Sequence, residues 1–161
     1  MLASAVVLGV VSGAAFGGDL RRLGRLSLRG LPVLLVAAAI RALGIFVPLP
    51  WPAYVAALLG FGIVAVLNRE LPGALLIAAG IALNVVVITL NAGMPVDQGA
   101  AASAGAPFRE DGLHVAMGER TVLAFLGDVL PMPLFRNVYS VGDVVLAAGG
   151  FWLPFRWLRQ R

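Results

Sequence analysis

The chain has 161 residues, of which 60% are apolar and only 12% are charged. Soluble domains carry about twice that charged fraction, and the mean hydropathy is +0.95. This composition excludes a soluble globular domain, a disordered tail and a nucleic-acid-binding module, and it predicts an all-α integral membrane protein. Because one spanning helix needs about 20 apolar residues, the apolar content is enough for four or five spans.

The polar residue types limit the chemistry that the chain can perform. The chain contains no cysteine, which excludes disulfides, thiolate metal sites and thiol catalysis. Its one histidine, His114, lies among Glu110, Asp111 and Glu119, and one imidazole among carboxylates is more typical of a solvated loop than of a metal centre. We therefore expect no metal and no cofactor.

Charge-free stretches divide the chain into five predicted membrane helices. The first ends before Asp19 and a basic loop, although a signal peptide is the alternative for this stretch. The second contains Arg41, and the prolines that follow it separate it from the third, because proline breaks a helix. The predicted spans cover residues 1–18, 31–47, 53–67, 73–91 and 137–155.

The distribution of arginine predicts the orientation of these spans. All twelve basic residues are arginines, and the net charge is +4. The positive-inside rule places the side with more arginines in the cytoplasm. We therefore expect a bacterial inner-membrane protein with an outside N-terminus and a cytoplasmic C-terminus, whose arginines bind anionic lipid headgroups. Eight arginines fall on one side (21, 22, 25, 29, 69, 156, 159 and 161) and three on the other (109, 120 and 136).

Residues 92–136 then form one long extracytoplasmic loop. Its first part, 97–107, is rich in small residues and is expected to be flexible. Its second part, 121–130, is apolar, with Thr121 as a possible N-cap. Because this segment is too short to span a bilayer, we expect an interfacial or re-entrant helix.

Two stripes of small or polar residues indicate how the helices meet. Gly9, Gly13 and Gly17 recur at every fourth residue, which favours close helix packing, either within this chain or in a dimer. In the fourth span, Gly73, Gly80, Asn84 and Asn91 lie on roughly one side, which we expect to face the bundle.

An ionisable side chain inside a predicted span needs a partner or a function, because placing one in the membrane costs about 2.5 to 3.5 kcal/mol on insertion scales. Arg41 lies midway along the second span, and Asp143 lies in the fifth, one turn after Ser140. We expect an Arg41–Asp143 pair within a polar cluster. Snorkelling of Arg41, or a water-filled cavity around it, is the alternative. The predicted cluster comprises Arg41, Asn84, Asn91, Ser140 and Asp143.

A second interpretation pairs Asp143 with Asp128. Two close carboxylates can share a proton and activate water. The segments Asn91-Ala92-Gly93 and Asn137…Asp143 resemble the bacterial lipoprotein signal peptidases, which combine an Asn-x-Gly segment with two aspartates at the membrane interface. The sequence departs from that family in the position and flanks of the second aspartate. The resemblance implies catalysis by Asp128 and Asp143.

A broader resemblance covers nearly the whole chain. Its most specific elements are Asn-x-Gly-x-Pro-Val at 91–96 and Ser-x-Gly-Asp at 140–143, together with Gly-Asp-Leu-Arg-Arg-Leu at 18–23 and Phe-Leu-Gly-Asp-Val-Leu-Pro at 125–131. This combination resembles a family of small bacterial polytopic membrane proteins catalogued as a domain of unknown function. The resemblance implies location and fold, and no mechanism.

Three functions remain open on the sequence. The first is a non-catalytic accessory or assembly protein, acting with a membrane-protein partner or as a homo-oligomer and without nucleic acid. The second is an intramembrane aspartyl hydrolase that uses Asp128 and Asp143. The third is an oligomeric path for protons or solutes through Arg41 and Asp143.

Overall fold

The computed structural model describes residues 1–106, 108 and 110–160, and it is mostly helical. Five long helices occupy the five apolar stretches, and their bounds differ from the predicted spans by a few residues. They are α1 (Leu2–Ala15), α2 (Leu31–Phe46), α3 (Trp51–Leu67), α4 (Ala74–Asn91) and α6 (Val141–Arg159).

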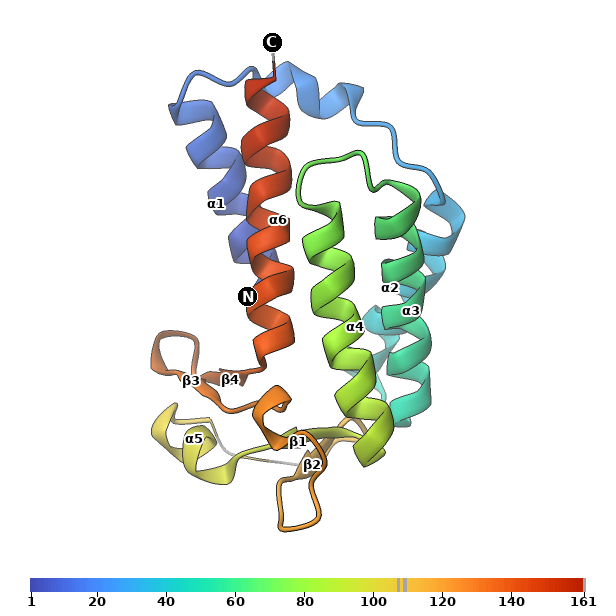
Figure 1. Cartoon of the computed structure of the whole chain (residues 1–161), viewed down its shortest axis with the longest axis vertical. Helices are drawn as coiled ribbons and strands as arrows, with labels where there is room; N and C mark the ends of the chain where they lie inside the picture. Colours follow the sequence, from blue (N-terminus) through green and yellow to red (C-terminus); the bar gives the residue numbers. More distant parts are fainter. Residues whose placement is uncertain (107, 109, 161) are drawn as a thin grey trace.

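The long helices pack side by side in an order that differs from their order in the chain. Helix α1 packs on α6, α6 on α4, α4 on α3, and α3 on α2. Figure 1 shows that long helices that follow one another in the chain run in opposite directions, so that α1 and α6 lie parallel. The C-terminus and the loop that carries η1 (Leu20–Arg25) lie at one end of the molecule, and residues 92–140 lie at the other.

Glycines allow α6 to approach both of its neighbours closely. A Cβ at Gly9 or Gly13 would meet the backbone of Phe151 or Phe155 in α6. A Cβ at Gly80 would lie 2.6 Å from the backbone nitrogen of Leu146. Gly9 and Gly13 of the first stripe and Gly73 and Gly80 of the fourth span therefore face α6, so the first two serve packing within the chain. Gly17 follows the end of α1 and a Cβ there would meet nothing within 4 Å, so the predicted stripe does not extend to it.

The lengths of the helices do not support the predicted bundle of five spanning helices. Among the described residues, only α4 is long and apolar enough to cross a membrane by itself. Helix α1 has 14 residues, which cover about 21 Å of a hydrocarbon core about 30 Å thick. Helix α6 includes Asp143 and two arginines in its 19 residues. The first charge-free stretch is longer than its helix because Phe16 and Gly17 form a turn after α1.

The described residues of 92–140 form a folded cap in place of the long loop expected over 92–136, of which 97–107 was expected to be flexible. Strand β1 (Met94–Val96) pairs in parallel with β2 (His114–Ala116), and β3 (Leu130–Met132) pairs antiparallel with β4 (Asn137–Tyr139). A bridge between Val96 and Asp128 connects the two pairs. The apolar residues Met94 and Leu126 join a buried cluster with Val87 and Ile88 of α4, which fixes the cap to the helices.

Three expectations for this region were wrong. Within 97–107, residues Gln98–Ser103 form helix α5, capped by the Asp97 side chain. Within 121–130, the only helical turn is η2 (Ala124–Leu126), and Thr121 accepts a hydrogen bond from the Gly118 N–H instead of capping a helix. The fifth helix begins at Val141 rather than at Asn137, because 137–139 pair with β3 and the turn η3 (Pro133–Phe135) reverses the chain before them.

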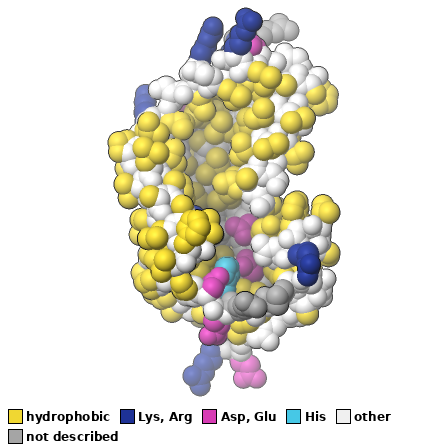
Figure 2. All heavy atoms as spheres, turned by 180° about the vertical axis from the view of Figure 1, so that it is seen from behind, with side chains coloured by type: hydrophobic (Ala, Val, Ile, Leu, Met, Phe, Trp, Pro, Cys, Tyr) yellow, Lys and Arg dark blue, Asp and Glu magenta, His cyan; other side chains and the backbone are white. Residues whose placement is uncertain are grey.

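The surface combines a wide apolar area with a polar hollow. Figure 2 shows apolar side chains on both sides of a furrow along the helices, with arginines at the end away from the cap and others at the cap. The chain's single histidine and several acidic side chains lie in this furrow, toward the cap. The polar hollow is therefore open along the apolar surface.

Candidate functional site

The Asn84 side chain joins α4 to the start of α6. It is only 5% exposed. Its Oδ1 accepts a hydrogen bond from Ser140 Oγ at 2.8 Å, and its Nδ2 donates to Asp143 Oδ1 at 2.9 Å. A Cβ at Gly142 would collide with this amide. Both ends of the buried amide are thus paired, as buried polar groups require.

Asp143 and Ser140 also form the capping box of α6. Ser140 Oγ accepts from the Asp143 N–H at 3.0 Å, and Asp143 Oδ2 accepts from the Ser140 N–H at 3.3 Å. A carboxylate in the first turn of a helix is stabilised by the helix dipole. Asp143 therefore lies at the N-terminal end of α6, beside the cap, instead of about 9 Å into a spanning helix as the sequence suggested.

Asp128 is held in the cap with its carboxyl group buried. Its N–H donates to the Pro95 carbonyl at 2.8 Å and its carbonyl accepts from the Asp97 N–H at 3.0 Å. The residue is 6% exposed, and its Oδ1 has no hydrogen-bond partner among the described residues. Burial, together with the nearby charge of Asp143, raises the pKa of Asp128 to about 8. Such a shift in a cavity is typical of functional carboxyl groups.

His114 lies between Asp111 and Asp128. Its Nδ1 is 2.9 Å from Asp111 Oδ2, and its Nε2 is 3.7 Å from Asp128 Oδ2. Partial burial works to raise the pKa of Asp111, but hydrogen bonds from His114 and Leu113 outweigh it and lower that pKa overall. The turn depends on Gly112, whose φ is +85° and whose Cβ would strike the Leu49 carbonyl.

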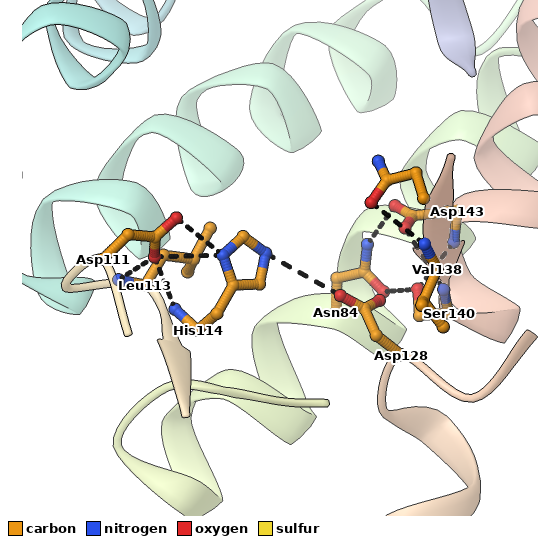
Figure 3. Close-up of polar contacts among 9 residues, drawn as sticks. Asn84, Asp111, Leu113, His114, Asp128, Val138, Ser140 and Asp143 are labelled. Carbon is orange, nitrogen blue, oxygen red and sulfur yellow. Dashed lines mark hydrogen bonds and ion pairs between the residues drawn. The ribbon is translucent and has the colours of Figure 1, made fainter. Parts of the chain in front are cut away.

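A cavity of about 210 Å³ lies in front of these groups. Its polar side consists of Asp111, His114, Asp128 and Asn137, and its apolar side includes Phe108 and Val138. Figure 3 shows the imidazole between Asp111 and Asp128, with Asn84, Ser140 and Asp143 beyond them. The structure thus gathers carboxyl groups and an imidazole that can exchange protons around an open space.

The other predicted site residues lie elsewhere. The Arg41 guanidinium lies 5.3 Å from the centre of the Tyr54 ring, and no ion pair joins Arg41 to Asp143 among the described residues. The expected pair does not form because Arg41 lies in α2, which packs on α3, and helices α3 and α4 lie between α2 and α6. The Asn91 amide binds the cap at Val122: its Nδ2 donates to the Val122 carbonyl, and its Oδ1 accepts from the Val122 N–H.

Sequence reasoning missed the role of His114. It grouped His114 with Glu110, Asp111 and Glu119 as solvated loop residues, and the two glutamates are exposed. Among the residues that the structure describes, no three potential ligands gather as a metal site. The local signal for the Asp111–His114 contact was the three-residue spacing across a glycine turn. The contact with Asp128 had no such signal, because it depends on the pairing of β1 with β2.

The comparison with known proteins gives a family. No curated protein and no solved structure matches the chain. One family model matches residues 25–155, which include the four later long helices nearly in full and the whole cap, and hence every residue of the site. The chain belongs to the family of unknown function DUF5317.

Proposed function

We propose that this protein is a membrane-embedded hydrolase in which Asp128 acts as the general acid and Asp143 as its ionised partner. The observation that carries the proposal is the buried Asp128 carboxyl, which has an unpartnered oxygen beside a cavity and feels the charge of Asp143. A buried polar atom without a partner calls for an explanation. If Asp128 donates a proton to a bound substrate, the substrate is the missing partner of its carboxyl group.

The two carboxyl groups suit attack by water on an acyl carbon. Asp143 takes a proton from a water molecule, whose oxygen bonds to the carbonyl carbon, while Asp128 gives its proton to the carbonyl oxygen. The proton on Asp143 then passes to the leaving nitrogen or oxygen as its bond to carbon breaks. The remaining hydroxyl returns a proton to Asp128, and both residues regain their starting states.

The negative charge around the cavity favours a substrate whose cleaved group is uncharged. Asp111 and Asp128 line the cavity and Asp143 lies near Asp128, and within the described residues no arginine forms an ion pair with any of the three. A phosphate ester would bring further negative charge and would be repelled. An amide or ester adds none, so we propose acyl hydrolysis rather than phosphoryl transfer.

The membrane part of the proposal rests on the surface. Large apolar side chains are exposed along the helices, among them Leu35, Ile45 and Phe46 of α2, the last at 83%. An exposed apolar area of this kind marks a membrane or partner surface. The arginines at the opposite end from the cap suit anionic headgroups of the cytoplasmic leaflet, so we place the cap outside, at the membrane surface.

An accessory role is the second candidate, and helix α2 favours it. Only Ala37 is buried among the 16 residues of α2, so a partner's helix or a second copy of this chain could cover the remaining faces. A conducting path has less support, since Arg41 and Asp143 belong to helices that α3 and α4 separate.

Hydrolysis can be tested with the full chain in lipid vesicles. Membrane-anchored peptides and acylated peptides are added to the vesicles, and new ends are detected by mass spectrometry. We expect products from the wild type and from Glu119→Gln, a matched change at an exposed carboxylate of the cap. Asp128→Asn should slow release at least 100-fold, the usual contribution of a general acid.

Two results would count against the hydrolase. Equal release by Asp128→Asn would remove the acid from the mechanism. If folded wild-type protein released nothing from any substrate, the accessory role would replace the hydrolase.

A further inference from the structure

The Asp111 turn fixes the orientation of the His114 ring. Asp111 Oδ1 accepts hydrogen bonds from the N–H groups of Leu113 at 3.1 Å and His114 at 2.9 Å. The same carboxylate contacts His114 Nδ1 through both oxygens, at 3.0 and 2.9 Å. Because a carboxylate only accepts hydrogen bonds, Nδ1 must carry the proton. In the neutral ring, Nε2 then has a free lone pair.

This lone pair faces the buried carboxyl of Asp128. The distance of 3.7 Å between Nε2 and Asp128 Oδ2 is longer than a hydrogen bond. A small shift of the ring, or one water from the adjoining cavity, would complete the connection. The His114 side chain is 33% exposed, whereas that of Asp128 is 8% exposed. The imidazole therefore lies between solvent and the buried carboxyl.

We propose that Asp111 and His114 form a proton relay to Asp128, in which Asp111 keeps a proton on Nδ1 and Nε2 exchanges a proton with the Asp128 carboxyl. In one direction the proton leaves the Asp128 oxygen and binds Nε2, which gives a carboxylate and an imidazolium. In the other direction the imidazolium returns it. No further reagent is needed: Nδ1 keeps its proton, and Nε2 passes the proton taken from Asp128 to a water of the adjoining cavity, or receives one from it.

The charges around the pair act on both directions of this exchange. Asp111 lies against the ring, and the imidazolium that forms would sit between its carboxylate and that of Asp128, which stabilises the transferred proton on the ring. Asp143 lies beyond Asp128 and disfavours a second negative charge there, which favours return of the proton to Asp128. The other polar side chains at the site, Asn84, Asn137 and Ser140, are neutral. Within the described chain, the ionisable groups around the pair are therefore Asp111, Asp143 and, on the residue whose N–H bonds the Asp128 carbonyl, Asp97.

The relay rests on the proposed function only for its purpose, which is to supply the proton to Asp128, the proposed general acid. Its existence can be measured without any substrate. Because the chain has one histidine, isotope-labelled histidine gives a single pair of ring nitrogen signals in nuclear magnetic resonance spectra of the full chain in micelles.

We expect the neutral ring to carry its proton on Nδ1. The Nε2 signal should shift with pH through a step near 8, where Asp128 titrates. Asp128→Asn should remove that step, and Asp111→Asn should move part of the ring population to the tautomer with the proton on Nε2. Glu119→Gln removes a carboxylate from the same cap and should change neither signal.

The relay would be overturned by a neutral ring protonated on Nε2, or by identical Nε2 titration curves in the wild type and Asp128→Asn. Its failure is distinct from that of the hydrolase. Asp128-dependent hydrolysis without coupled titration would refute the relay alone. Coupled titration in a protein that hydrolyses nothing would refute the hydrolase alone.

Discussion

The Asn84 amide donates a 2.9 Å hydrogen bond to the Asp143 carboxylate, across 59 positions of sequence. The contact ties the middle of α4 to the first turn of α6, which directly follows the cap. Since the other end of the same amide accepts from Ser140, one side chain sets both the start of α6 and the placement of the charge behind Asp128.

Replacing Asn84 by leucine should destabilise the protein by about 2 to 3 kcal/mol, because Ser140 and Asp143 would both lose a buried partner. Thermal unfolding in detergent measures this change. Asn137→Leu is the control, since that exposed side chain bonds only the adjacent Val138 N–H and its loss should shift stability far less. Equal shifts for the two variants would show that the buried network contributes nothing.

Close contact between α4 and α6 is a second requirement of the site. In Gly142→Ala, the new methyl group would collide with the Asn84 amide. Overpacking of this kind costs about 1 to 3 kcal/mol, and it should also weaken the Asn84–Asp143 contact. Gly118→Ala is the matched change, because a Cβ there meets nothing within 4 Å. Similar melting temperatures for the two variants would contradict the close packing.

The sequence was a good guide to the parts of the fold that are encoded locally. Apolar runs located the five long helices, and the spacing of Gly80 and Asn84 identified the face of α4 that meets α6. The pairing of Asn84 with Ser140 and Asp143 was expected in outline, since few buried polar groups were available to satisfy one another.

The cap was not predictable in the same way. Its strands have three residues each, which is too short for an alternating pattern to stand out. The burial of Asp128 depends on its bridge to Val96, 32 positions earlier. His114 reaches Asp128 only because β2 pairs with β1, so its place in the site depends on contacts distant in sequence.

The buried Asp128 should make stability depend on pH. Its pKa is about 8 in the folded protein against an ordinary value of 3.8, so between these values the folded chain keeps a proton that the unfolded chain releases. Stability should therefore fall as pH rises from about 4 to about 8 and level off above. The linkage allows a loss of at most about 6 kcal/mol over this range.

Thermal unfolding in detergent at pH 5 and pH 9 tests this dependence. Asp128→Asn, which resembles the protonated acid, should unfold at a higher temperature than the wild type at the alkaline pH and should show a flatter pH profile. Glu119→Gln should keep the wild-type slope. A slope that Asp128→Asn leaves unchanged would assign the pH dependence to other groups.

The proposed orientation can be measured with single cysteines, because the natural chain contains none. Ser27→Cys places a thiol at the arginine-rich end, and Ser103→Cys places one in the cap. Both positions are exposed. If the positive-inside rule holds, a membrane-impermeant maleimide added to intact cells should label Ser103→Cys at once and Ser27→Cys only after the membrane is opened. The reverse labelling pattern would show that the protein has the opposite orientation in the membrane. Equal labelling of both cysteines in intact cells would argue that the two ends of the chain do not lie on opposite sides of a membrane.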